Sequence, residues 1–369
     1  MEPNYVSMQE KSENTVEPER KEDLIQETAS QPSTETSDEL DPEVVKTIES
    51  MKKGLMQHGI YIAIIVLLVC GGFAFFWHHW NTHHRVGADE KGVYQYTDVQ
   101  MVEFGKDCLF GRDGNTIDYD KAFIWFQQAA ENDFSSGQTY LGYMYELGLG
   151  VEQDYTEAAK WYRLAADQNN AYAETRLGNL YQRGMGVEQD YLKAVKWFRK
   201  AAMQGEPGGQ NYLAYMYEKG LGVETDYNEA FKWYKKSAEQ GFSLAQKKMG
   251  MFYRDGLGVD QDYEESISWY LKSAEQGDAG GQIGLAYMYE QGLGVKQDYD
   301  EALKWFRRAA EQNNAYAQNY LGYMYEEGLG VERDLTEAIK WYKLAADQGD
   351  EYAIEQLPVV LSELNESEL

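Results

Sequence analysis

The fold is decided by the stretch from Leu141 to Gln168, which reads L-G-Y-M-Y-E-L-G-L-G-V-E-Q-D-Y-T-E-A-A-K-W-Y-R-L-A-A-D-Q. The stretch from Leu321 to Gln348 repeats it as L-G-Y-M-Y-E-E-G-L-G-V-E-R-D-L-T-E-A-I-K-W-Y-K-L-A-A-D-Q. Tryptophan recurs every 36 residues, each time followed by Phe or Tyr, at Trp125, Trp161, Trp197, Trp233, Trp269, Trp305 and Trp341. Self-similarity at a fixed period of this length is typical of folds built by stacking one small unit on the next.

Each unit predicts two helices joined by a short glycine-containing loop. Leu141 and Met144 recur at helical spacing in the first half of the unit, and alanines flank the aromatic pair at helical spacing in the second half. Gly148 is expected to end the first helix with a positive φ, and Gly150 permits a second tight backbone position. Gly142 is replaced by alanine in two other units, so its position requires a small side chain where helices cross closely.

The second helix begins with a recognisable cap. Asp154 lies directly before it, and Glu157 follows three residues later. This spacing predicts a capping box, in which the two side chains bond each other's backbone N–H groups.

The pattern L-G-x-M-Y-E-x-G-x-G-V, followed by D-Y-x-x-A-x-x-W-Y-x-x-A-A-x-Q-G, closely resembles the Sel1-like repeat family, a relative of the tetratricopeptide repeat. The resemblance covers about residues 97–369. It implies an all-α fold, a right-handed α/α superhelix (solenoid) of seven 36-residue helix hairpins. Members of the family commonly act as adaptors in assemblies, many of them bacterial and extracytoplasmic. We therefore expect seven repeats over residues 97–349 and a C-terminal capping helix and tail over residues 350–369.

Two different segments precede the repeats. Residues 1–50 contain 14 acidic and four basic residues and lack apolar periodicity, which predicts a disordered acidic tail. Residues 60–77 are 18 uncharged, mostly apolar residues. A run of this length can cross a hydrocarbon core about 30 Å thick, so we expect one transmembrane helix over residues 58–80 and a linker over residues 81–96.

The orientation of this anchor follows from its flanking charges. Lys46, Lys52 and Lys53 precede the apolar run, whereas Arg85 and Lys91 follow it. The positive-inside rule favours a cytoplasmic N-terminus by one basic residue. This orientation places the anchor in a bacterial inner membrane and the repeats in the periplasm. The alternative, with the repeats in the cytoplasm, stays open.

A partner-binding surface is expected on the concave face, which the first helices line in tetratricopeptide-like superhelices. By that resemblance, three positions per unit point inward, and two of them carry tyrosine and glutamate in most units, a pairing that suits a basic or aromatic-rich peptide. The unit around Trp269 departs from this pattern, because it carries Lys247 and Arg254 at inward positions. The candidate partner-binding residues are Tyr143, Tyr215, Tyr287, Tyr323, Glu146, Glu218, Glu290, Glu326, Lys247 and Arg254. Recurring tyrosine can equally serve packing between repeats, and both interpretations stay open at this point.

Composition and motifs argue against catalysis and against nucleic acid. The net charge of −28 opposes binding to a phosphate backbone. All five histidines, His58, His78, His79, His83 and His84, lie outside the repeats, so neither a catalytic triad nor a zinc site can be drawn there. We expect no enzyme activity and no cofactor. The run from His78 to Arg85 could hold a metal ion through His79 and His83, although two histidines on one helix rarely suffice.

The sequence therefore predicts a non-enzymatic, membrane-anchored scaffold that binds a partner protein or peptide on the concave face of its repeats. The alternative is a cytosol-facing regulatory component of a signalling or envelope-assembly complex. An envelope enzyme is a weaker third possibility.

Overall fold

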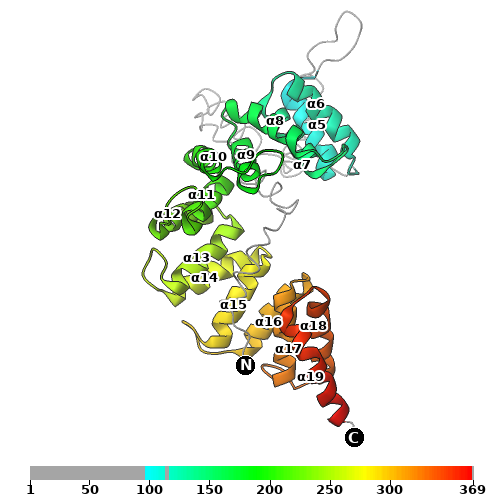
Figure 1. Cartoon of the computed structure of the whole chain (residues 1–369), viewed down its shortest axis with the longest axis vertical. Coiled ribbons are helices and arrows are strands. Elements are labelled where there is room, and N and C mark those ends of the chain that lie inside the picture. Colours follow the sequence, from blue (N-terminus) through cyan, green and yellow to red (C-terminus); the bar gives the residue numbers. More distant parts are fainter. Residues whose placement is uncertain (1–95, 113–115, 368–369) are drawn as a thin grey trace, which may run out of the picture. The chain divides into compact units, whose positions relative to one another are not determined.

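The computed structural model describes residues 96–112 and 116–367, and every regular element there is an α-helix (Figure 1). The predicted acidic tail, transmembrane segment and histidine run lie outside these residues. Within them, no helix is both long enough and apolar enough to cross a membrane.

Fifteen helices alternate as the first and second members of successive hairpins, and the fourteen from α5 to α18 are each 13 residues long. The first helices are α5 Asp98–Phe110, α7 Ser135–Leu147, α9 Ala171–Arg183, α11 Pro207–Lys219, α13 Ser243–Asp255, α15 Ala279–Gln291 and α17 Ala315–Glu327. The second helices are α6 Tyr119–Glu131, α8 Tyr155–Asp167, α10 Tyr191–Met203, α12 Tyr227–Glu239, α14 Tyr263–Glu275, α16 Tyr299–Glu311 and α18 Leu335–Asp347. The last helix, α19, spans Glu351–Ser367.

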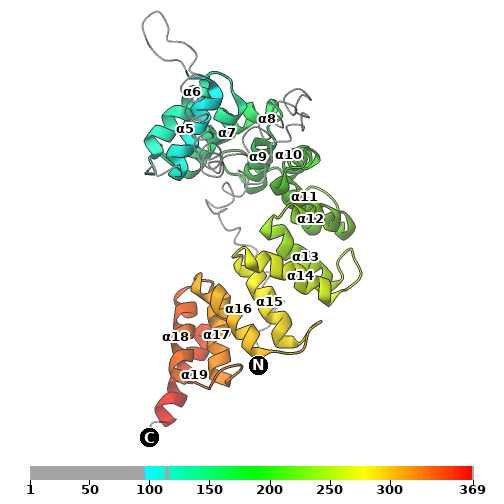
Figure 2. The same cartoon turned by 180° about the vertical axis from the view of Figure 1, so that it is seen from behind.

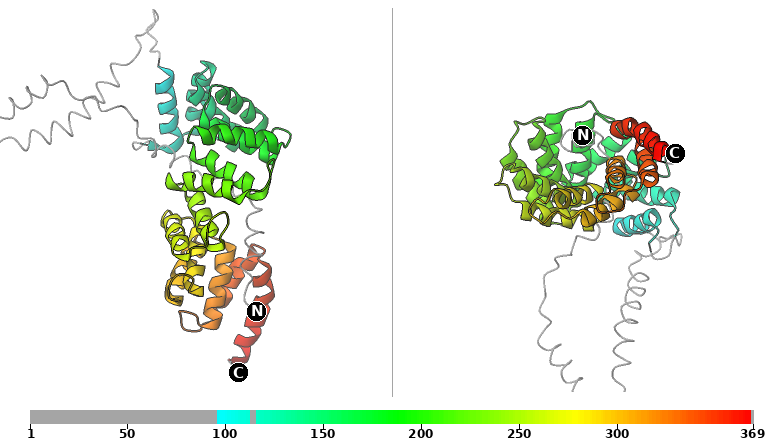
Figure 3. Two further views of the ribbon diagram at one scale, coloured as in Figure 1. Left: turned by 90° about the vertical axis from the view of Figure 1, so that its left-hand side faces the viewer. Right: turned by 90° about the horizontal axis from the view of Figure 1, so that it is seen from below.

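The described helices fall into two compact units, α5 in one and α6–α19 in the other. Within α6–α19 each helix packs against its neighbours along the chain, from α6 with α7 to α18 with α19 (Figures 1 and 2). First helices of neighbouring hairpins also meet, α9 with α11 and α13 with α15. No pair of second helices in this unit makes a comparable contact. At these joints the stack therefore curves towards its first helices. Figure 3 shows the helices from two further sides.

The centre of each hairpin is the aromatic residue after the tryptophan rather than the tryptophan itself. These seven rings are completely buried: Phe126, Tyr162, Phe198, Tyr234, Tyr270, Phe306 and Tyr342. Trp197, Trp269 and Trp305 keep 6–8% of their surface exposed, and the other four tryptophans of the repeats keep more. The Trp269 ring, for example, has the Lys272 ammonium 3.7 Å above its centroid, a cation–π arrangement at the edge of the core.

The close helix crossing expected at Gly142 is confirmed. A Cβ added there would lie 2.9 Å from the ring of Tyr162, and one added at Gly178 would lie 2.6 Å from the ring of Phe198. The small residue on the first helix thus makes room for the buried ring of the second.

The loop glycines behave as predicted, and the second has a further function. Gly148 caps α7 at φ 66°, and Gly150 also has φ 66°. A Cβ on Gly150 would lie 2.5 Å from the carbonyl oxygen of Tyr119, at the start of the preceding second helix. The loop of one repeat therefore rests on the backbone of the repeat before it.

The capping prediction is half correct. Asp154 Oδ1 accepts hydrogen bonds from the backbone N–H groups of Thr156 and Glu157, at 2.8 and 3.1 Å. The Asp154 N–H does not donate to the Glu157 carboxylate as a capping box requires. It donates instead to the carbonyl oxygen of Tyr145 at 2.9 Å and so closes the loop. Glu157 instead pairs with Lys160 at 2.5 Å.

The stack ends on α19, which packs against α18 and α17 and buries Ala353 and Val360. The closing helix predicted from the sequence is therefore present. Ile354, Val359 and Leu361 of this helix are exposed. The right-handed sense of the superhelix stays a prediction.

Candidate interaction surface and the joints between repeats

The predicted tyrosine row lies on the first helices, and it is partly incorporated into the core. Tyr143 keeps only 4% of its surface exposed. Tyr215, Tyr287 and Tyr323 are half-buried and pack against the hydrophobic clusters of their hairpins. These three rings therefore stabilise the stack with one part and remain accessible with the other. Their partner-binding role stays a prediction.

The predicted glutamates lie deeper than the sequence suggested. Glu146, Glu218 and Glu290 are at most 8% exposed, and Glu326 is half-buried. A row of carboxylates open to a basic peptide was expected, and the structure instead directs at least two of them into the joints between repeats.

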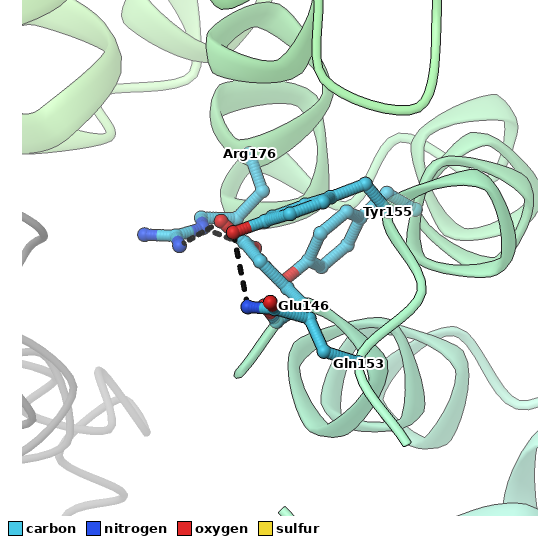
Figure 4. A network of polar contacts seen from close by, with 5 residues as sticks. Glu146, Gln153, Tyr155 and Arg176 are labelled. Atoms are coloured by element: carbon cyan, nitrogen blue, oxygen red, sulfur yellow. Dashed lines mark hydrogen bonds and ion pairs between the residues drawn. The ribbon is translucent and has the colours of Figure 1, made fainter. Parts of the chain in front are cut away.

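Glu146 is the centre of one such joint. Its Oε2 accepts a hydrogen bond from the Tyr162 hydroxyl at 2.6 Å, and its Oε1 lies 2.6 Å from Arg176 Nη2. Arg176 Nε adds a third bond to Oε2 at 3.2 Å. Figure 4 shows Arg176 directed at Glu146. Because Arg176 belongs to the next repeat, this joint connects two hairpins through a buried ion pair.

The backbone under Glu146 is held by the following loop. Gln153 Nε2 donates to the Glu146 carbonyl oxygen at 2.8 Å and to the Tyr155 hydroxyl at 3.0 Å (Figure 4). The loop therefore holds the backbone of Glu146, while Tyr162 of the second helix holds its carboxylate.

Burial changes the titration of this pair. Removal from water raises the pKa of Glu146 to about 7 and lowers the pKa of Arg176 to about 10. It also raises the pKa of Tyr162 far above its ordinary value, so this hydroxyl stays a donor.

Glu218 forms a second joint of the same kind. Its Oε2 accepts from the Tyr234 hydroxyl at 2.7 Å, and its Oε1 lies 3.3 Å from Lys248 Nζ of the next repeat. Lys219 approaches the same oxygen at 3.1 Å. Both carboxylates are therefore matched by cations of their own chain.

A different joint occurs wherever the buried ring is phenylalanine. There the ring stacks nearly parallel on a tyrosine of the next repeat, with interplanar angles of 12–15°. The three stacks are Phe126–Tyr140 at 4.7 Å, Phe198–Tyr212 at 5.1 Å and Phe306–Tyr320 at 4.5 Å between ring centroids.

The two joints follow a rule that the sequence analysis missed. Tyr140, Tyr212 and Tyr320 occupy the same repeat position as the cations Arg176 and Lys248. Phenylalanine after the tryptophan is accompanied by tyrosine at this position, because an apolar ring can stack but cannot donate to a carboxylate. The signal was visible as paired variation between units of this one chain, in Tyr or Phe after the tryptophan and in the residue before the conserved leucine.

The two predicted cations have different surroundings. Arg254 is buried, makes two bonds to Asp255 at 2.7 and 2.8 Å, and places its guanidinium 5.8 Å from the Tyr287 ring centroid. Lys247 is half-buried, and its side chain lies beside Gly280 of α15. Arg254 thus acts within the repeats.

Glutamine side chains form a further connection between repeats that was not anticipated. The glutamine directly after each second helix from α8 onward donates its amide to a side-chain oxygen 30 residues earlier, at 2.6–2.9 Å. The six donors are Gln168, Gln204, Gln240, Gln276, Gln312 and Gln348. Five acceptors are glutamines and one is Glu174. This row of bonds fixes the register of each hairpin on the one before.

The Sel1 repeat family model matches residues 107–134, 135–170, 171–206, 207–242, 243–278, 279–314 and 315–350. The chain belongs to the Sel1 repeat family. Sel1 repeat proteins are generally protein-interaction scaffolds, and the Sel1 solenoid is typically non-enzymatic. A search among curated proteins found no match.

Two solved Sel1 repeat structures from bacteria are similar to this one. One is c5321, a protective antigen of uropathogenic Escherichia coli, with 40% identity and a TM-score of 0.59. The match covers 71% of this Sel1 chain but only 56% of the antigen. The other is a Sel1 repeat protein from Oxalobacter formigenes, with 32% identity, a TM-score of 0.60, and coverage of 68% of this chain and 97% of that one.

Metal binding finds no support in the Sel1 repeats. The residues that the structure describes contain no group of three or more His, Cys, Asp or Glu side chains able to hold an ion. The run His78–His84 lies outside the described residues, so its metal prediction is untested.

Proposed function

We propose that this Sel1 chain is a membrane-anchored scaffold whose first helices bind a peptide segment of a partner protein. Two observations support the proposal: neighbouring first helices contact one another, α9 with α11 and α13 with α15, and Tyr215, Tyr287 and Tyr323, at the same position of their first helices, are half-exposed. Tyrosine offers a large, rigid contact area at low entropic cost.

The partner is expected to need fewer basic residues than a full row of free glutamates would bind. Glu146 and Glu218 already bond cations of the chain itself. Glu326 is half-buried and Glu327 is exposed, so a basic residue of the partner is best accommodated at α17. We therefore propose that tyrosine contacts provide most of the binding free energy, with one acidic corner fixing the direction of the peptide.

The anchor is proposed from the apolar run of residues 60–77, with the N-terminus in the cytoplasm and the repeats in the periplasm of a bacterial inner membrane. Reporter fusions before Met1 and after Leu369 test this topology. Alkaline phosphatase activity only at the C-terminal fusion supports it. Cytoplasmic fluorescence from a C-terminal fluorescent protein supports the alternative, a cytosol-facing regulatory component.

The binding face is tested separately by photo-crosslinking in cells. A photoreactive amino acid replaces Tyr215, Tyr287 or Tyr323 in turn. In a control variant the same amino acid replaces Lys235, an exposed residue of the second helix α12. We expect one partner to be captured from the tyrosine positions and not from Lys235. Capture of the same partner only from the second helix would contradict the proposed face without affecting the topology result.

A further inference from the structure

The second helix α10 differs in charge from the other second helices of the chain. It carries four basic residues and no acidic residue, whereas each of the others contains at least two acidic residues. The basic residues are Lys193, Lys196, Arg199 and Lys200. In a chain with a net charge of −28, this is a local reversal of the electrostatic field.

The last position of α10 also lacks the acidic residue that the other second helices carry. Met203 is 76% exposed. The equivalent residue is acidic in all six other second helices: Glu131, Asp167, Glu239, Glu275, Glu311 and Asp347. The fold therefore does not require an apolar side chain here.

The beginning of α10 differs in two further residues. Leu192 is 72% exposed, where the other second helices carry Asp, Thr, Asn or Glu. Lys193 replaces a glutamate that five of the other six helices carry. Exposed leucine and methionine cost free energy in water, which is consistent with a surface that is covered in a complex.

These residues line a groove. Leu192, Val195, Lys196, Arg199 and Met203 form one wall. The other wall is the loop after α11, at Gly222 and Val223. The groove has a volume of about 340 Å³ and is partly open, which is enough for one or two bulky side chains.

The cations along this groove are positioned but not fully neutralised. Arg199 Nη2 donates to the Tyr217 hydroxyl at 3.0 Å, which fixes the guanidinium without cancelling its charge. Lys200 lies 3.7 Å from Glu174 and Lys193 lies 3.1 Å from Asp190. Within the described part of the chain Lys196 forms no ion pair.

We propose that α10 and the loop after α11 form a second docking surface, which binds an acidic peptide segment carrying at least one bulky apolar side chain. The apolar residue enters between Leu192, Met203 and Val223, and the acidic residues pair with Lys196 and Arg199. This surface lies on a second helix, so the proposal is independent of the tyrosine face. A peptide that enters the groove fits better than an anionic membrane, because exposed Glu224, directly after Val223 of the groove wall, would repel a flat anionic surface.

The test uses the full-length chain in detergent micelles and three synthetic fluorescent peptides. One alternates glutamate with leucine, one has the same leucines with lysine, and one has the same glutamates with glycine. Fluorescence anisotropy is expected to show binding only for the first peptide, with an affinity that falls at least tenfold between 50 mM and 500 mM salt.

Two variants locate the binding. Leu192→Thr, Lys193→Glu and Met203→Asp together give α10 the residues that α8 and α18 carry at these positions, so folding is preserved; this variant is expected to weaken binding at least tenfold. Arg199→Glu should weaken it similarly. Arg307→Glu is the matched control on α16, because Arg307 also donates to a tyrosine hydroxyl, at 2.5 Å from Tyr325, and it should leave binding unchanged.

Three results would overturn the proposal. They are equal binding by wild type and the triple variant, no binding of the glutamate–leucine peptide, or preferential binding of the chain to phosphatidylglycerol vesicles through α10.

Discussion

At the scale of single residues, Glu146 places a titratable group inside a joint between repeats. Its pKa is raised to about 7 by burial, while the carboxyl of the unfolded chain titrates near its ordinary value of 4.5. The folded chain therefore binds a proton between these two pH values that the unfolded chain has lost. Stability from this group is complete below pH 4.5 and is lost as the pH rises through 7.

We predict that the free energy of unfolding of the wild type, relative to Glu146→Gln, decreases by up to about 3 kcal/mol between pH 4.5 and pH 7.5. Glutamine cannot titrate, so the variant lacks this component. Thermal unfolding of both proteins at a series of pH values measures the difference. A constant difference across the series would show that Glu146 keeps the same protonation state throughout.

Two glycines with positive φ allow the cost of backbone strain to be measured separately from the cost of a steric clash. Gly205 has φ 91° with open space around an added Cβ, whereas a Cβ on Gly186, at φ 66°, would collide with the Tyr155 backbone. We predict that Gly205→Ala costs about 1–2 kcal/mol through left-handed strain alone. Gly186→Ala should cost clearly more, because two repeats must also move apart. Chemical denaturation of both variants tests this order, and equal losses would contradict it.

At the scale of elements, five of the joints between hairpins are of two kinds, three aromatic and two charged. The charged joint of Glu146, Tyr162 and Arg176 occupies the same positions as Gln182, Phe198 and Tyr212 in the aromatic joint. Each set is complementary within itself. Mixing them leaves a buried carboxylate without its cation, which typically costs about 3–5 kcal/mol.

We predict that Arg176→Tyr alone destabilises the repeats by about 3 kcal/mol or more. The triple variant Glu146→Gln, Tyr162→Phe and Arg176→Tyr should recover most of that loss, because it reproduces the sequence of the aromatic joint. Unfolding free energies of the single, double and triple variants measure the coupling. Additive losses across the series would show that the three residues do not act as a unit.

At the scale of the whole molecule, each hairpin from α6 onward contacts mainly its neighbours, so stability should be distributed as a chain of local terms. We predict that Tyr234→Ala, which removes a completely buried ring, lowers amide hydrogen-exchange protection most in α11–α13 and leaves α17–α19 nearly unchanged. Tyr342→Ala should do the reverse. A uniform loss of protection along all helices in both variants would indicate a single cooperative unit instead.

The sequence by itself determined the helix hairpin, its 36-residue period, the glycine and aspartate at its loop and the number of repeats. These features are local, because they depend on helical spacing, capping and positive φ within one unit. The tertiary structure decided what lies between units. It directed Glu146 and Glu218 into joints with cations 30 residues ahead, made the residue after each tryptophan the centre of the core, and aligned the glutamine row. Those outcomes depend on which faces of consecutive hairpins meet, and a periodic sequence lists the same residues whichever way the units are stacked.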